Sequence, residues 1–476
     1  MRQALANASA AAAGNDTMER FDARVNRGEC DVSVKTRIRW IGRHGVARVV
    51  IGRAHRKGDL HARILSDPAA RADPYATYDE IRARGPLVPG RLMMQAVSHE
   101  AVTSVLRSDA FAVGFDPDEM PWVARHLLTR VAADERIVGP IDPPSLLVTN
   151  APDHTRYRRL VSRVFTAKAV EALRARVEER TTELLDAMAA RPHGEPVDLV
   201  AEFASLLPVT VIAEILGVPL DMRRQFLTWG SMAAPVLDIG LSYRQFVESE
   251  TALEEMSDWM YSHFERLRRE PGDDIVSKLV HLDDESGKLD DRELLAIAGL
   301  LLAAGFETTV NLLGSGAVLL IENPEERVAL AADPSLWANA VDEMLRYESP
   351  VQATSRRSIR DTEVCGVPVK AGSFVTAMIG GANRDPDVFP DPHRFDVRRS
   401  NAREHLAFSS GAHYCIGASL ARLEGEIGLR RLFERFPDLS LAGKPSLRGT
   451  RTLRGFDTIP VHLNSNRPAE REPHAV

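Results

Sequence analysis

The segment from Asp290 to Ile321 constrains the fold of this chain more than any other stretch of its sequence. Its apolar run, Leu294 to Phe306, is bounded by Glu293 and Glu307, and its thirteen residues fall short of the roughly 20 that cross a bilayer. Asp290 followed by Glu293 three residues later is typical of a helix start, where the two residues cap each other's backbone. The pattern predicts one long helix buried in a large core.

The rest of the chain predicts a mainly helical domain. From Tyr75 onward most segments have apolar residues at helical spacing, and short strand-like pieces occur at Thr362–Val369 and Phe374–Ile379. The expected fold class is therefore mainly α with small β-sheets (α+β). No linker rich in Pro, Gly or Ser divides the middle of the chain, so we expect a single large domain over residues 59–463. A disordered tail (1–34), a basic amphipathic extension (35–58) and a flexible C-terminal tail (464–476) are expected around it.

The extension before residue 59 allows two interpretations. Residues 35–57 carry basic side chains interleaved with apolar ones and contain no acidic residue. A basic amphipathic helix can lie on an anionic membrane surface, which would make a peripheral membrane contact. The alternative is a solvated helix packed on the edge of the domain. We favour the second interpretation because the apolar positions do not form one clean stripe at a period of 3.6 residues.

Charge and cysteine content exclude some classes of protein. The net charge is −7 and the isoelectric point is near 6.1, which gives no case for nucleic-acid binding. The three cysteines, Cys30, Cys365 and Cys415, are few and widely spaced, as in a reduced cytoplasmic protein rather than a disulfide scaffold.

The most informative segment runs from Phe408 to Gly417. A cysteine thiolate can be the axial ligand of a haem iron, to which it donates electron density. Gly411 and Gly417 would let the backbone turn around the sulfur of Cys415, and the helix that follows would present its positive end to the thiolate. His413 is placed to reach a haem propionate, and Phe408 can cover the ring from the sulfur side. A lone cysteine would more often be buried and inert.

The full pattern Phe-x-x-Gly-x-His-x-Cys-x-Gly resembles that of the cytochrome P450 family. The resemblance covers Tyr75 to Leu463 and is nearest to bacterial members of the ferredoxin-dependent type, among them mycobacterial proteins and polyketide or macrolide hydroxylases. It implies the cytochrome P450 fold, with haem b between the long central helix and the helix after Cys415. One residue departs from the usual bacterial pattern, because Ser409 stands where most members have Gly.

A second match is Glu343-Met344-Leu345-Arg346. A Glu and an Arg three residues apart share one helix face, and alone they would form a surface ion pair of little energetic value. In the family this pair is buried and tied to an arginine before the cysteine loop. The resemblance implies that Arg394 supplies that arginine, in a structural role.

A third match lies inside the long helix, from Ala304 to Thr309. Thr308 can bend the helix by bonding back to a carbonyl one turn earlier, which makes room for O₂ and water. Glu307 beside it can relay protons, which is general acid catalysis. Ala304 and Gly305 are expected next to the cofactor and the substrate. A helix-packing glycine and a satisfied threonine are the alternative.

Basic residues make the fourth match. His154 and Arg158 lie four residues apart on one predicted helix face, a spacing suited to gripping haem propionates. Arg356 is the further propionate partner that the resemblance implies. Each of these residues alone could be a solvated surface base.

The expected function is that of a monooxygenase. By resemblance, one atom of O₂ enters a C–H or C=C bond of the substrate and the other leaves as water. The sequence contains no dinucleotide fingerprint and no iron–sulfur cysteine set, so a separate ferredoxin and an NAD(P)H-dependent reductase are expected as partners. The segments expected to line the pocket, Phe111–Ser145, Phe226–Leu241 and Val351–Ser355, are mainly apolar. They fit a polyketide or lipid-like substrate, such as a mycolactone-type side chain.

Three other functions stay open at this point. A peroxide-driven peroxygenase would also use Cys415, although the Glu307-Thr308 pair argues against it. A non-catalytic haem or ligand-binding protein would need Cys415 but neither member of that pair. A helical interaction protein would need none of the three residues.

Overall fold

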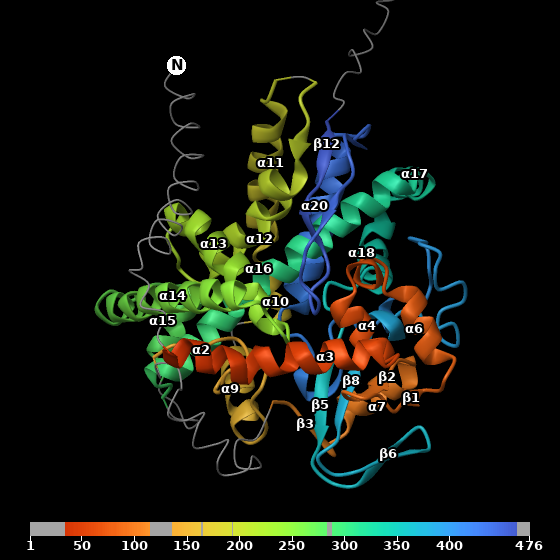
Figure 1. Cartoon of the computed structure of the whole chain (residues 1–476). Coiled ribbons are helices and arrows are strands. Elements are labelled where there is room, and N and C mark those ends of the chain that lie inside the picture. The colour runs from red at the N-terminus through yellow and green to blue at the C-terminus, as the bar shows by residue number, and fades with distance from the viewer. Residues whose placement is uncertain (1–33, 115–135, 163–164, 193, 283–287, 464–476) are drawn as a thin grey trace, which may run out of the picture.

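The computed structural model describes residues 34–114, 136–162, 165–192, 194–282 and 288–463. The expected tails before residue 34 and after residue 463 lie outside these ranges, as do residues 115–135 of one expected pocket segment. Helices make up most of the described chain and the strands are short, as the sequence predicts (Figure 1).

The helices of the first part of the chain precede the long central one. They are α2 (Val34–Trp40), η1 (Ile41–Gly45), α3 (Val46–Arg56), α4 (Leu60–Ser66), α5 (Pro68–Ala72), α6 (Tyr75–Arg82), α7 (His99–Arg107), α9 (Asp153–Ser162), α10 (Ala167–Glu171), α11 (Arg174–Ala189), η3 (Val200–Ala204), α12 (Leu206–Ile215), η4 (Leu220–Met222), α13 (Arg223–Ala233), η5 (Ala234–Leu237), α14 (Tyr243–Arg269) and α15 (Ile275–Val280).

The helices of the second part begin with the central one. They are α16 (Asp291–Glu322), α17 (Pro324–Ala332), η6 (Pro334–Leu336), α18 (Trp337–Tyr347), α19 (Ile379–Ala382), η7 (Ala402–Glu404), η8 (Gly411–His413) and α20 (Ala418–Arg435). Figure 1 shows α16 running through the middle of the molecule.

The strands form small sheets. They are β1 (Leu87–Val88), β2 (Met94–Ala96), β3 (Phe111–Ala112), β4 (Val197–Asp198), β5 (Thr354–Ser358), β6 (Thr362–Val364), β7 (Val367–Val369), β8 (Phe374–Ala377), β9 (Ser440–Leu441), β10 (Ser446–Leu447), β11 (Phe456–Thr458) and β12 (Pro460–His462). The largest sheet has the order β1-β2-β8-β5-β3, in which only β2 and β8 are parallel. A second sheet has the order β4-β12-β9, while β6 with β7 and β10 with β11 form two-stranded sheets.

One strand-like segment forms a hairpin. The sequence predicts strand structure over Thr362–Val369, and the structure has two antiparallel strands there, β6 and β7. The chain reverses at Cys365 and Gly366, whose φ angles of 49° and 78° lie in the left-handed region. Two successive residues with positive φ make the tight turn that joins hairpin strands. A cysteine at such a position is unusual, so no turn between the two strands was expected from the local residue types.

The central helix confirms its prediction. α16 begins after Asp290, and the capping box with Glu293 is present in both directions. By length and composition α16 could cross a membrane, but 67% of its most apolar window is buried inside the protein. The helix is therefore a core helix, and most of its residues are buried.

Close packing joins α16 to α20, the helix that follows the cysteine loop. A Cβ on Gly425 would lie 3.0 Å from a methyl carbon of Leu312, and one on Gly428 would lie 3.0 Å from a methyl carbon of Leu313. These two glycines therefore let the axes of α20 and α16 approach each other. The approach fixes where the start of α20, and the loop before it, lies relative to the central helix.

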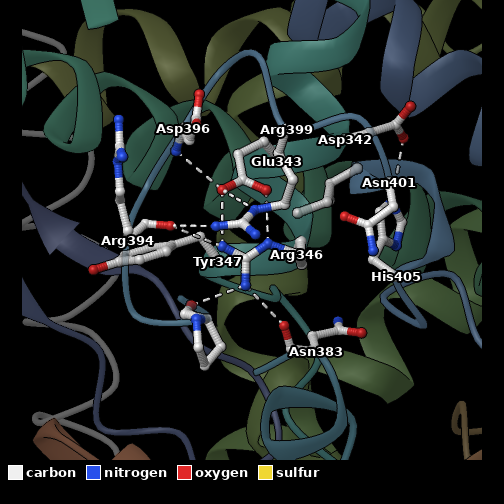
Figure 2. A network of polar contacts seen from close by, with 12 residues as sticks. Asp342, Glu343, Arg346, Tyr347, Asn383, Arg394, Asp396, Arg399, Asn401 and His405 are labelled. Carbon is white, nitrogen blue, oxygen red and sulfur yellow. Dashed lines mark hydrogen bonds and ion pairs between the residues drawn. The ribbon is translucent and has the colours of Figure 1, made fainter. Parts of the chain in front are cut away.

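A buried ion network holds the chain segment that leads to the cysteine loop (Figure 2). Glu343 and Arg346 of α18 are fully buried, and the guanidinium donates to both carboxylate oxygens, at 2.6 and 2.8 Å. Arg346 also donates to the main-chain carbonyls of Asn383, Pro392 and Arg394. One guanidinium therefore satisfies three carbonyls that would otherwise be buried without a donor.

The arginine that completes this network is Arg399, so the prediction of Arg394 was wrong. Nε of Arg399 donates to Glu343 at 3.1 Å, and its terminal nitrogens donate to the carbonyls of Pro390, Asp391 and Arg394. Arg394 contributes only that carbonyl, and its side chain is exposed. Figure 2 shows its side chain directed away from Glu343. The segment turns at Asp391, where φ is 48°, so the distance along the sequence is a poor guide to which arginine points inward.

The network continues into the cysteine loop. Asn383 accepts a hydrogen bond from the main-chain N–H of Leu406 at 2.6 Å, two residues before Phe408. Asp342, next to Glu343, accepts hydrogen bonds from His405 at 3.1 Å and from Arg422 of α20 at 2.7 Å. Burial alone would raise the pKa of Asp342, but hydrogen bonds from His405 and Arg422 lower it. Both ends of the loop are thus tied to α18.

We expect Arg399→Met to destabilise the protein by about 3 kcal/mol, because it removes a cation from a buried carboxylate and donors from three carbonyls. Arg394→Met is the matched control, and its effect should stay within about 0.5 kcal/mol because the side chain is exposed. Urea unfolding followed by circular dichroism measures both values. Equal losses for the two variants would contradict the assignment of Arg399.

Candidate functional site

One face in the middle of α16 is not packed against protein. Ala304 is exposed and Thr308, one turn later, is half-buried, while nearly all residues before and after them on the helix are buried. Residues spaced by four lie on the same helix face. This face therefore looks into a space inside the protein. Gly305 is half-buried beside it in the sequence, and a Cβ there would lie 3.3 Å from Ile212 of α12.

The hydroxyls of two threonines bond back along α16, as the sequence predicts for the first of them. Thr308 donates to the carbonyl of Ala304 at 2.9 Å, and Thr309 donates to the carbonyl of Gly305 at 3.1 Å. Only Thr308 faces the inner space, because Thr309 is buried. α16 nevertheless remains an α-helix from end to end, so no break in the helix accompanies these bonds.

The cysteine loop turns on left-handed residues. Gly411 has a φ of 71°, and a Cβ there would lie 2.6 Å from the carbonyl oxygen of Leu106, so only glycine fits. Gly417 differs from the prediction, because its φ is −87° and a Cβ would lie 4.0 Å from the sulfur of Cys415. Its contribution is its main-chain N–H, which hydrogen-bonds the sulfur. The N–H of Cys415 donates to the carbonyl of Phe408 at 2.9 Å.

Ser409 adopts the conformation of the glycine that it replaces. Its φ is 63°, in the left-handed region, where a Cβ costs roughly 1–2 kcal/mol. Its N–H donates to the carbonyl of Leu406 at 2.8 Å. The departure from the family pattern therefore leaves the path of the loop in place and adds backbone strain.

Cys415 lies deep in the molecule and still has exposed surface. Desolvation by the surrounding protein raises the pKa of its thiol, against the lowering effects of the Gly417 N–H, Arg158 and Arg422. A side chain that is both desolvated and accessible faces an inner space rather than the outer surface. Arg422 also stacks over the ring of Phe408 at 4.6 Å, and Phe408 is buried beside the loop.

Four basic side chains that were predicted to bind the haem propionates lie together: His154, Arg158, Arg356 and His413. The imidazole rings of His154 and His413 are 4.1 Å apart. Burial, together with the charges of His154, Arg356 and Arg158, lowers the pKa of His413 to about 3. Burial also lowers the pKa of Arg356 to about 10. Within the described residues, no ion pair joins any of these four side chains to a carboxylate, so the cluster is suited to binding an anionic group.

These observations fit the haem expected from the sequence. Cys415 offers a sulfur ligand, and the α16 face at Ala304 and Thr308 offers an uncharged surface. The basic cluster of His154, Arg158, Arg356 and His413 offers donors for the two carboxylates that haem b carries. The exposed backbone of Gly411 and the N–H of Gly417 border the sulfur.

The sequence did not reveal the partner of Glu307. The Glu307 carboxylate is buried and forms an ion pair with Arg448, which follows β10. Arg448 also donates to the carbonyl of Phe456 at 3.1 Å, which fixes the guanidinium against β11. Nothing in the local sequence connects residues 141 positions apart. One and two turns beyond Glu307, the amide of Asn311 and the hydroxyl of Ser315 are buried without hydrogen-bond partners in the described structure.

We expect Ser409→Gly to stabilise the protein by about 1 kcal/mol, because glycine adopts the left-handed conformation without a Cβ penalty. The matched control is Ser410→Gly. Ser410 has an extended backbone with a φ of −151°, and its hydroxyl accepts a hydrogen bond from Arg107 at 2.8 Å. The Ser410→Gly substitution should leave stability unchanged or lower it. Thermal unfolding measures the stability of both variants. A loss of stability in Ser409→Gly would show that the strain is not real.

Comparisons with known proteins agree with the geometry. A family model for cytochrome P450 matches residues 335–445, which include Glu343 and Cys415. The chain is 48% identical over 437 residues to a Mycobacterium tuberculosis protein named cytochrome P450 140, covering 91% of this chain and 99% of that relative. It is 38% identical over 415 residues to the 6-deoxyerythronolide B hydroxylase of Saccharopolyspora erythraea, covering 84% of this chain and 98% of that enzyme.

The fold is shared as well. A crystal structure of P450BioI, in complex with an acyl carrier protein ligated to hexadec-9Z-enoic acid, superposes with a TM-score of 0.76 at 31% identity. The match covers 83% of this chain and 99% of that one. Both the fold and the cofactor expected from the sequence are thereby confirmed: the chain belongs to the cytochrome P450 family, whose members are monooxygenases that bind haem through a cysteine thiolate.

Proposed function

We propose that this protein inserts one atom of O₂ into a C–H or C=C bond of a polyketide or lipid-like substrate, with electrons from a separate ferredoxin. For hydroxylation, the C–H bond, O₂, two electrons and two protons give C–OH and water. The protein must therefore supply a cofactor site, a proton path, an apolar pocket and a place for an electron donor.

The observation that carries the proposal is the combination of three features in one chain. The accessible sulfur of Cys415, the Thr308 face of α16 and a buried basic cluster without a carboxylate partner among the described residues occur together. A structural cysteine would need neither of the other two features. A non-catalytic haem protein would not need Thr308 on the inner face beside Glu307.

Haem, when bound, supplies O₂ activation and oxygen transfer. Cys415 would hold the haem iron through its thiolate, which the Gly417 N–H and the Arg158 and Arg422 charges stabilise. We assign the propionate contacts to His154, Arg158, Arg356 and His413. Phe408 covers the sulfur side, and its ring is held in place by Arg422.

The proton path begins at Glu307 and Thr308. The Thr308 hydroxyl now donates to Ala304, and it can pass a proton into the inner space when it turns from that carbonyl. Glu307 is held by Arg448, so its carboxylate is a buried ion whose charge is balanced. For Glu307 to deliver protons, this ion pair must loosen in each turnover. Arg448 is therefore a positioning residue for Glu307.

An apolar pocket supports the substrate class. It has a volume of about 240 Å³ and is lined mainly by aliphatic side chains, including Leu237 and Ile239 from one expected segment. Residues 352–355 of another expected segment line it as well, and Arg356 of the basic cluster follows directly. The related hydroxylase named above acts on 6-deoxyerythronolide B, and P450BioI was crystallised with a fatty acyl group. A mycolactone-type side chain, a polyketide chain, falls in the same polyketide and lipid-like class.

The test of the cofactor assignment is the absorption spectrum of the dithionite-reduced protein with CO. We expect the strongly red-shifted Soret band of a thiolate-ligated haem, and we expect Cys415→Ser to abolish it because a hydroxyl is a poor ligand for the iron. Cys365→Ser, at the other cysteine of the described chain, is the matched control and should keep the band. A colourless purified protein, or a band that survives in Cys415→Ser, would refute the assignment.

The test of the proton path compares two neighbouring threonines. Thr308→Ala should lower product formed with ferredoxin, reductase and NAD(P)H by roughly 10²-fold, because proton delivery contributes on that order. Thr309→Ala removes an equivalent back-bond on a buried face and should leave turnover within about twofold. Equal activity of Thr308→Ala and the unmodified protein would contradict the relay. Peroxide-driven turnover that matches the ferredoxin-driven rate would identify a peroxygenase instead.

A further inference from the structure

Exposed aliphatic side chains are concentrated at the start of the described chain. Of the thirteen exposed large hydrophobic residues in the described structure, six lie between residues 34 and 50, on α2, η1 and α3. They are Val34, Ile38, Ile41, Val46, Val49 and Val50. We call this set the aliphatic face. Single exposed aliphatics are ordinary on a protein surface, but a gathering of this kind indicates an interaction site.

The opposite side of the same helices is fixed to the domain. Nε1 of Trp40 donates to the carbonyl of Leu241 at 2.9 Å, and Arg48 donates to the carbonyl of Gly240 at 3.0 Å. The buried ring of His44 accepts from the N–H groups of Gly240 and Leu241, at 3.2 and 3.3 Å. The packing at the domain edge that the sequence favours is therefore present. It also holds the aliphatic face outward.

A π-helical turn explains why the sequence shows no clean stripe. The N–H of Val46 bonds to the carbonyl of Ile41, five residues earlier, so the turn holds one residue more than an α-helical turn. A strict period of 3.6 residues fails across this turn. Val46 nevertheless lies one turn above Ile41, so the aliphatic face continues from α2 into α3. Figure 1 shows α2 and α3 as one continuous rod along the outside of the molecule.

The charged residues of the segment that carries the aliphatic face are all basic. Residues 34–57 contain eight Lys and Arg residues and no acidic residue, in a chain whose net charge is −7. Arg39 and Arg43 pair with Glu250 and Asp142 of the domain, whereas Arg53 and Lys57 are exposed at the end of the rod. A rigid helix with outward valines and isoleucines among positive charges fits an anionic lipid surface, where the aliphatics enter the interface and the bases meet the headgroups.

The apolar pocket opens beside this face. Val50 belongs to the aliphatic face and also lines the pocket, together with Ala47 and Ile51 of the same helix. Ile239, exposed on the loop that α3 grips, lines the pocket too. An apolar molecule dissolved in a bilayer would therefore meet the pocket at the docked surface.

We propose that the aliphatic face docks the protein onto an anionic lipid bilayer and places the apolar pocket against the membrane surface. Docking goes beyond the monooxygenase function proposed above and does not depend on it. Only entry of substrate from the bilayer rests on that function. Membrane docking and the monooxygenase function can be refuted separately, because vesicle binding requires no turnover.

The experiment is co-sedimentation of the full-length haem-loaded protein with vesicles. We expect binding to vesicles of phosphatidylcholine with phosphatidylglycerol, and at least tenfold weaker binding to pure phosphatidylcholine, because each base near an anionic surface contributes about 1 kcal/mol. Raising the salt concentration should release the protein from the anionic vesicles. A protein that stays in the supernatant with both kinds of vesicle would overturn the proposal. An acidic protein would then be the expected partner of the aliphatic face.

Matched variants test the surface itself. Val46→Gln/Val49→Gln should weaken binding to anionic vesicles by roughly tenfold, since two aliphatic anchors are lost. Val328→Gln is the control, because Val328 is 67% exposed on α17, outside the aliphatic face. Arg53→Gln/Lys57→Gln should weaken binding and its salt dependence. Thermal unfolding and the haem spectrum should not change in any variant. Equal binding of the paired valine variant and the Val328 control would refute the assigned face.

Discussion

The rest of the structure depends on the ion pairs that the buried carboxylate of Glu343 makes with two arginines. The carboxylate neutralises Arg346 and Arg399, which are buried in the same place, and their remaining donors satisfy the main-chain carbonyls of the segment before the cysteine loop. Without the carboxylate, two cations would remain in a medium of low dielectric, which is far more costly than losing a surface pair. This network, with Asp342 and Arg422, fixes the loop that carries Cys415.

The candidate site combines a cluster of basic side chains with an uncharged face of α16. Arg158 of the positive cluster and Arg422 of α20 influence Cys415, whereas Ala304 and Thr308 of α16 are uncharged. The carboxylate of Glu307, next to Thr308 in the sequence, is paired with Arg448. In the function proposed above, the cluster that contains His413 and Arg356 would bind anionic groups, and Glu307 and Thr308 of α16 would transfer protons.

On the outer surface, too, the two sides of one segment have different properties. Residues 34–56 use one side for anchoring contacts to residues 240–241 and leave the other side aliphatic and basic. Val50 of this surface and Ile239 also line the apolar pocket. In the proposal above, the helices at residues 34–56 would therefore border the entrance for an apolar substrate.

The sequence by itself determined the features that local patterns encode. These include α16 with its capping box, the back-bond of Thr308 and the Glu343–Arg346 pair. Spacing along a helix and capping chemistry involve residues within one or two turns, so they can be read directly. The cysteine pattern also indicated the cofactor, through its resemblance to the cytochrome P450 family.

Only the tertiary structure decided which distant residues meet. Arg399 rather than Arg394 reaches Glu343 because the backbone reverses at Asp391, and Arg448 reaches Glu307 across more than a hundred residues. The outward direction of the aliphatic face depends on a single extra residue in a π-helical turn. Such contacts are set by how the chain is folded back on itself. A sequence pattern records the local period of a segment but not the partner that the segment finds.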